Sequence, residues 1–163
     1  MLIRPLSKHH DTKGFDCGNG DLNRWLVQIA GQHRKKLVSK TFVAAESETA
    51  SEILGYYAIG LLELRNEALP ANLQQRLPRQ VPAFRLGRLA VSSKHQRKKI
   101  GEFMLFDAID RVTRISEEAG GVGLVVDAKD SAIGFYRRYG FEIMADHPNR
   151  MILAIRAEQE FRP

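Results

Sequence analysis

Residues 88–105 read RLAVSSKHQRKKIGEFML, which is the end of an apolar strand, a short basic loop and the start of a helix. The first N–H groups of a helix have no partner inside the helix and carry a partial positive charge, so this turn predicts a phosphate site. Lys98 and Lys99 add charge, and Gly101 permits close approach to the backbone. Many helices begin with basic residues and bind nothing, so an ordinary basic helix start remains the alternative.

The rest of the chain predicts strands and helices in alternation. Runs rich in β-branched and aromatic residues predict strands over residues 2–6, 41–45, 53–62, 84–92, 122–126, 141–144 and 151–155. Apolar residues at helical spacing predict one or two helices over 21–37 and single helices over 101–119 and 131–139. The second and third strands predict an antiparallel hairpin. The strand, helix, strand order after residue 84 predicts a crossover in a mixed sheet.

Several details refine this prediction. Asn19 or Asp21 suits the N-cap of the first helix, and Gly120 suits the end of the long helix. The apolar face of the long helix is expected to comprise Met104, Leu105, Ala108, Ile109, Val112 and Ile115. Residues 65–83 contain three prolines and predict a surface insertion with one helical turn around residues 72–76.

Composition favours one folded domain covering residues 1–163. Of these 163 residues 44% are hydrophobic and 27% are charged, as in ordinary globular proteins. The single Cys17 cannot form an internal disulfide, which suits a reducing compartment. The N-terminus lacks the apolar core of a signal peptide, and no apolar run approaches the roughly 20 residues of a membrane span. We therefore expect a cytoplasmic protein with no membrane association.

The net charge of +6 is concentrated in three basic clusters, at residues 33–36, 94–99 and 137–138. Such clusters favour polyanionic partners, although a solvated basic face is the alternative for each one. No spacing of the five histidines indicates a metal site.

A second motif makes the first more specific. Residues 127–141 read DAKDSAIGFYRRYGF, a strand end, a turn and a short helix. Together the two motifs resemble those of the GNAT N-acetyltransferases. The phosphate-loop pattern of that family falls on Gln96, Arg97, Lys98, Lys99, Ile100 and Gly101, and its Phe-Tyr, Gly-Phe pattern falls on Phe135, Tyr136, Gly140 and Phe141.

More narrowly, the chain is similar to the toxin-type GNATs of bacterial toxin–antitoxin pairs, which acetylate aminoacyl-tRNA. Short matching segments cover nearly the whole chain, at Phe15, Cys17 and Gly18, at Leu22, Trp25 and Leu26, at Gly55 to Tyr57 and at Gly87 to Val91. The resemblance implies the GNAT fold, a mixed α/β sheet of six to seven strands with splayed central strands and about four helices. It also implies acetyl-CoA as donor, no metal, a ribbon–helix–helix antitoxin as partner and a homodimer.

The resemblance implies roles for individual residues. Coenzyme contacts would come from Leu89, Ala90, Val91, Gln96, Arg97, Lys98, Lys99, Ile100, Gly101 and Phe135. Tyr136 would protonate or stabilise the departing thiolate, with a packed structural tyrosine as the alternative. Phosphate contacts to tRNA would come from Arg34, Lys35, Lys36, Arg85, Arg88 and Lys94. No general base is evident beyond Glu63, but an α-amino group titrates near 7.7–8.0, so a substantial fraction of it is neutral near physiological pH without one.

One departure from the family pattern bears on activity. Lys99 stands where the phosphate loop usually has its first glycine, and a positive φ there would cost lysine about 1 kcal/mol. Lys99 would either crowd the pyrophosphate or pair with a coenzyme phosphate. If Lys99 prevents coenzyme binding, the chain would be a binding module that retains the fold without activity. A GNAT acting on a small amine or a protein N-terminus is a separate alternative to the toxin.

Overall fold

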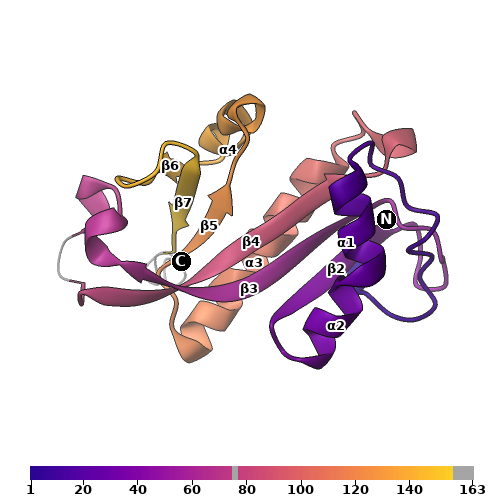
Figure 1. Cartoon of the computed structure of the whole chain (residues 1–163), viewed down its shortest axis with the longest axis horizontal. Coiled ribbons are helices and arrows are strands. Elements are labelled where there is room, and N and C mark those ends of the chain that lie inside the picture. Colours follow the sequence, from indigo (N-terminus) through magenta and orange to yellow (C-terminus); the bar gives the residue numbers. More distant parts are fainter. Residues whose placement is uncertain (75–76, 156–163) are drawn as a thin grey trace, which may run out of the picture. The chain divides into compact units, whose positions relative to one another are not determined.

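The computed structural model describes residues 1–74 and 77–155. In that part of the chain the strands are β1 (Leu2–Pro5), β2 (Ser39–Ala45), β3 (Gly55–Arg65), β4 (Gln80–Val91), β5 (Gly123–Asp127), β6 (Glu142–Ile143) and β7 (Arg150–Ala154). The α-helices described are α1 (Gly20–Gln28), α2 (Ala30–Lys35), α3 (Ile100–Ala119) and α4 (Ile133–Arg138) (Figure 1).

The strands form one mixed sheet in the order β1-β2-β3-β4-β5-β7-β6. β4 and β5 are parallel and are joined through α3, so the predicted crossover is confirmed. β2 and β3 pair antiparallel from Ser39–Gly60 to Ala44–Gly55, so the predicted hairpin is also confirmed. The register of β4 with β5 covers only Phe84 to Leu86, which fits the expected splayed central strands.

Contacts divide the chain into two compact units, each made of two separate segments. Unit 1 comprises residues 1–60 and 87–109, and unit 2 comprises residues 61–86 and 110–163. The single domain over residues 1–163 stays a prediction.

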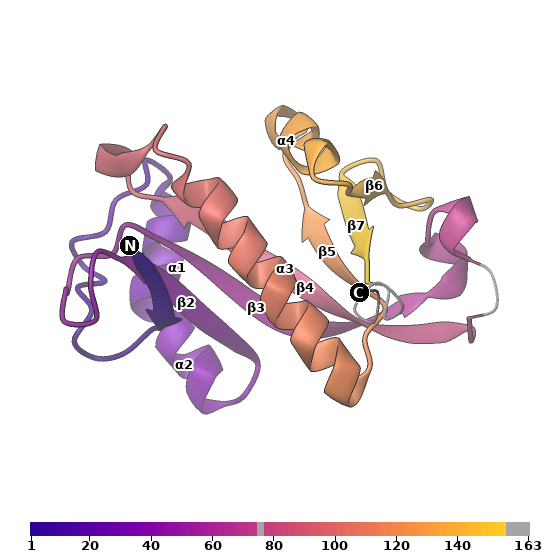
Figure 2. The same ribbon diagram turned by 180° about the vertical axis from the view of Figure 1, so that it is seen from behind.

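The core of unit 1 lies between the sheet and the first two helices. Trp25 and Leu26 of α1 pack with Val43 and Tyr56 of the sheet, all at most 6% exposed. The Asn19 side chain caps α1 by accepting hydrogen bonds from the backbone N–H groups of residues 21 and 22. On the other face the first half of α3 lies against β3, as Figure 2 shows from behind. A Cβ at Gly55 would lie 2.7 Å from the Met104 methyl carbon of α3 and 2.8 Å from the Ala90 carbonyl oxygen, and because that backbone atom cannot easily shift, the position requires a glycine.

The core of unit 2 includes part of the proline-containing insertion. That segment forms two short 3₁₀ turns, Asn66–Ala68 and Ala71–Leu73, while residues 75 and 76 lie outside the described residues. Leu69 is 1% exposed and packs with Val81 and Val125. The predicted surface insertion is therefore only partly at the surface, because Leu69 is buried and Leu73 and Leu77 are half-buried against the same core.

Most predicted boundaries lie within a few residues of those observed, with some exceptions. β4 begins at Gln80, four residues before the expected start, and the last predicted helix divides into a 3₁₀ turn, Asp130–Ala132, and α4. Gly120, with φ of 91°, directly follows α3, so the predicted helix end is confirmed. Ile115 was expected on the buried face of α3 but is 40% exposed. Spacing fixes the direction of a side chain, but not whether another element covers that turn.

None of the helices in the described residues is long and apolar enough to cross a membrane.

Candidate active site

The basic loop of unit 1 is fixed at the point where it leaves β4. The Ser92 N–H donates to the Leu54 carbonyl at 2.8 Å, and the Ser93 N–H donates to the Asp16 carbonyl at 2.8 Å. Ser92 is 6% exposed, and the 3₁₀ turn Ser93–His95 follows it. The four residues that remain before α3 therefore start from a fixed backbone.

Two residues of this loop have left-handed backbone conformations. Arg97 has φ of 66° and Lys99 has φ of 62°. Each costs about 1–2 kcal/mol in a residue other than glycine. Left-handed residues in such a short loop turn backbone N–H groups toward a common point, as in anion-binding nests. Lys99 therefore has the positive φ that was considered from the sequence, with its cost for a lysine.

Lys99 also begins α3, because its carbonyl accepts the Phe103 N–H at 3.0 Å. The free N–H groups at the start of this 20-residue helix therefore adjoin the loop. A Cβ at Gly101 would meet only Val91, at an ordinary 3.7 Å. Packing within the protein does not demand a glycine there, which fits a position kept small for a ligand. The loop thus has the charge, the N–H groups and the open backbone that the pyrophosphate of acetyl-CoA requires.

The loop side chains point mainly to solvent. Gln96, Arg97, Lys98 and Lys99 are exposed, whereas Ile100 is 4% exposed and anchors the start of α3. Lys98 Nζ lies 3.5 Å from His95 Nδ1, and His95 Nε2 lies 3.3 Å from Glu52 Oε2. Among the described residues no carboxylate pairs with Lys99, so its charge remains available to an anion.

The predicted pantetheine strand is the last part of β4. Ala90 is 5% exposed and packs in the core of unit 1, while Leu89 and Val91 are half-buried. These three residues lie beyond the register with β5, which ends at Leu86. Backbone groups that a neighbouring strand does not pair are suited to hydrogen bonds with an extended ligand.

In unit 2, Tyr136 lies on α4 within an aromatic cluster. Its ring centroid is 5.2 Å from that of Phe135 and 5.3 Å from that of Phe141, both edge-on. Tyr136 is 9% exposed, and this burial raises its pKa to about 12. The phenol therefore keeps its proton at neutral pH and serves as a hydrogen-bond donor or acid rather than as a base.

The residues proposed from the sequence to contact tRNA have different environments. Lys94 is exposed, as are Arg34 and Lys35 of α2 and Lys36 at the C-cap of that helix. Arg88 lies with its guanidinium 4.7 Å above the Trp25 ring, and Trp25 in turn stacks on Tyr56 at 5.9 Å. This cation–π contact fixes the direction of the Arg88 cation.

Arg85 is engaged within unit 2. Its guanidinium donates to Asp127 at 2.6 Å, and Arg150 donates to the same carboxylate at 2.9 Å. Desolvation alone would raise the pKa of Asp127, but these hydrogen bonds and charges outweigh it and hold the pKa below its ordinary value. A phosphate would have to compete with Asp127 for Arg85, so Arg85 is a weaker candidate than the sequence indicated. Asp127 was not predicted from the sequence, because its two arginine partners lie on strands distant from it in the sequence.

Two other reactive side chains are the single cysteine, Cys17, and the possible general base, Glu63. The Cys17 thiol is half-buried and donates to the Asn19 carbonyl at 3.6 Å, and Glu63 is exposed on β3. The described residues contain no group of three or more His, Cys, Asp or Glu that would hold a metal ion.

Comparison with known families identifies the class to which these features belong. Residues 38–143 match the model of the acetyltransferase (GNAT) domain, which covers most of the chain, from β2 to β6. The chain belongs to the GNAT family and is an N-acetyltransferase that uses acetyl-CoA as donor.

Individual relatives and solved structures show which kinds of GNAT protein this chain is similar to. A protein of Mycobacterium tuberculosis described as a tRNA-acetylating toxin is 28% identical over 94% of this chain and 91% of its own length. The structure of AtaT complexed with acetyl-methionyl-tRNAfMet has a TM-score of 0.86 at 25% identity, covering 94% of each chain. A tyrosine-to-phenylalanine mutant of AtaT, bound to the C-terminus of the antitoxin AtaR and acetyl-CoA, has a TM-score of 0.79 at 25% identity, covering 98% and 97%.

Proposed function

We propose that this protein is a toxin that acetylates the amino group of aminoacyl-tRNA and thereby blocks translation. The observation that carries the proposal is the loop before α3, where left-handed Arg97 and Lys99 precede the free N–H groups of a helix. This arrangement suits the pyrophosphate of acetyl-CoA. The described relatives that act on or bind tRNA support the choice of acceptor.

In this proposal each predicted coenzyme residue has a distinct role. The backbone of Leu89 to Val91 hydrogen-bonds the pantetheine arm as an added strand would. The amides from Gln96 to Gly101 hold the pyrophosphate, with Lys99 paired to a phosphate oxygen. Phe135 packs beside the coenzyme arm. These contacts fix the thioester for attack by the acceptor amine.

Tyr136 acts when the carbon–sulfur bond breaks. A thiol has a reference pKa near 8.5, so complete proton transfer from a phenol with a pKa of about 12 to a thiolate is uphill. Burial therefore favours a hydrogen bond that stabilises the developing negative charge on sulfur over full proton transfer. The amine needs no strong base, because an α-amino group with a pKa near 7.7–8.0 has a substantial neutral fraction at cellular pH.

The proposed partners follow from the acceptor and from the relatives. A ribbon–helix–helix antitoxin would neutralise the enzyme. The AtaT complex with AtaR supports an antitoxin as the partner. We further propose a homodimer that works in the cytoplasm, where charged tRNA is found. The exposed cations Arg34, Lys35, Lys36 and Lys94 would contact tRNA phosphates, and Arg88 would do so from its fixed position on Trp25.

The test is acetyl transfer from labelled acetyl-CoA to a pool of charged tRNA, with uncharged tRNA and polyamines as parallel acceptors. We expect label on charged tRNA alone, released with the amino acid when the ester is hydrolysed. Equal labelling of polyamines would show a small-amine enzyme. The absence of label on every acceptor, together with no acetyl-CoA binding, would show a binding module.

A further inference from the structure

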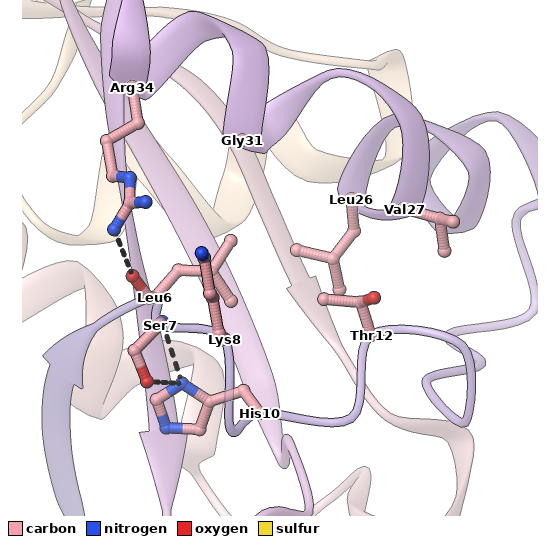
Figure 3. Close-up of a pocket in the computed structure, with 9 residues that line it drawn as sticks. All are labelled: Leu6, Ser7, Lys8, His10, Thr12, Leu26, Val27, Gly31 and Arg34. Carbon is pink, nitrogen blue, oxygen red and sulfur yellow. Dashed lines mark hydrogen bonds between the residues drawn. The ribbon is translucent and has the colours of Figure 1, made fainter.

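A pocket in unit 1 lies outside the coenzyme loop and is not used by the proposed chemistry. Figure 3 shows it between the segment after β1 and the first two helices. Its volume is about 180 Å³, and it is lined by Leu6, Ser7, Lys8, His10, Thr12, Leu26, Val27, Gly31 and Arg34. Pockets for whole small molecules usually measure about 300–1,000 Å³, so this one fits a single chemical group.

The charge of the pocket has one sign. Lys8 and Arg34 both line the pocket, and the hydroxyl groups of Ser7 and Thr12 add hydrogen-bonding capacity (Figure 3). None of the nine lining residues is acidic, and within the described residues neither Lys8 nor Arg34 has a carboxylate partner. Leu6 and Leu26, at 9% and 1% exposed, form an apolar wall that strengthens attraction to an anion.

The pocket is also preorganised. The His10 N–H donates to the Ser7 carbonyl at 3.2 Å, and the Ser7 N–H donates back to His10 Nδ1 at 3.0 Å. His10 is 7% exposed, so its buried side chain anchors this turn and fixes the backbone that carries Lys8. Arg34 is directed toward the pocket by its contact with the Leu6 carbonyl at 3.5 Å.

We infer that this pocket binds one backbone phosphate of the tRNA acceptor, held between Lys8 and Arg34. This inference rests on the proposed function. A phosphate is favoured over a protein carboxylate because two further exposed cations follow Arg34, namely Lys35 in the last turn of α2 and Lys36 at its C-cap. A row of cations matches the repeating charge of a nucleic acid, whereas a single carboxylate would need only the pocket.

The test measures binding of uncharged tRNA over a series of salt concentrations, which requires no acetyl transfer. We expect Lys8→Met and Arg34→Met each to weaken binding about fivefold to tenfold and to lower the salt slope by about one, as for the loss of one phosphate contact. Arg34→Lys, which keeps the charge, should bind nearly as tightly as the unaltered protein. Acetyl-CoA affinity should stay unchanged in all three variants, which would show that they fold.

Lys13→Met is the matched control, because Lys13 is an exposed cation of the same loop that does not line the pocket. Its effect should not exceed about twofold. If Lys8→Met and Arg34→Met bind tRNA no worse than Lys13→Met, the inference is wrong. If these two variants keep tRNA binding but lose antitoxin binding, the pocket is a site for a carboxylate of the antitoxin. If tRNA is never acetylated but the pocket variants still lose affinity, the proposed function fails and the phosphate pocket stands.

Discussion

At the scale of single residues, the hydroxyl of Tyr136 is the group whose removal tests the chemistry most directly. We expect Tyr136→Phe to lower kcat about 100-fold, at the lower end of the range for acid–base groups, with little change in KM for acetyl-CoA. Tyr139→Phe, which removes a hydroxyl from the residue after α4, is the control and should stay within a few-fold. Full turnover by Tyr136→Phe at saturating acetyl-CoA would leave Tyr136 as a packed aromatic residue.

The pH profile of the unaltered enzyme follows from the same residue. Because the pKa of Tyr136 is about 12, its proton is present throughout the range from pH 6 to 10. The rate should therefore rise with pH as the acceptor amine loses its proton near 7.7–8.0 and then level off. A fall in kcat between pH 8 and 10 would indicate an acid with a much lower pKa than that of Tyr136.

Lys99 allows a prediction about stability that is separate from catalysis. Its φ of 62° costs a lysine about 1 kcal/mol that a glycine would not lose, so Lys99→Gly should raise Tm by about 2–4 °C. Lys98→Gly is the control, because residue 98 is not among those with positive φ. This substitution relieves no backbone strain and only raises the conformational entropy of the unfolded chain. Thermal unfolding of both variants without ligand checks this, and a lower Tm for Lys99→Gly would refute it.

At the scale of elements, Asp127 at the end of β5 ties together its two neighbouring strands. Arg85 on β4 and Arg150 on β7 both donate to it, so Asp127→Asn should lower the free energy of unfolding by about 1 kcal/mol at pH 7. The pKa of Asp127 is lower in the folded protein, so its contribution is present above about pH 4 and is lost as the pH falls further. Denaturant titrations at pH 7 and pH 3.5 check this.

Glu67→Gln is the control for that experiment. Its ion pair with Arg65 measures 3.5 Å, with both side chains about three-quarters exposed, so its removal should be nearly neutral at either pH. A deficit in Asp127→Asn that persists unchanged at pH 3.5 would show that packing, rather than charge, accounts for the loss.

Elements were predictable where local patterns determine them. The capped α1, the hairpin of β2 and β3 and the long α3 follow from spacing and end signals within each segment. The 3₁₀ turns at residues 66–73 were not predictable, because the burial of Leu69 depends on strands distant in the sequence. The same holds for the site, since motifs located the coenzyme loop and Tyr136, whereas the pocket around Lys8 needs the fold that brings Arg34 to it.

At the scale of the whole molecule, both compact units are discontinuous in sequence. β3 and β4 each run from one unit into the other, and α3 does so near residue 109. Unit 1 needs residues that follow residue 86, and unit 2 needs strands that end only at residue 154. Neither unit is therefore a contiguous segment that can be released by a single cleavage.

This arrangement bears on when, during synthesis, the proposed activity can first arise. A ribosome makes the chain from the N-terminus, so β5, α4 and β7 emerge after every residue of unit 1. A chain interrupted before β5 holds the coenzyme loop but lacks Tyr136 and the strands that complete unit 2. The proposed transfer to an acceptor therefore has to await the second half of unit 2, even though the loop that would hold the donor is made earlier.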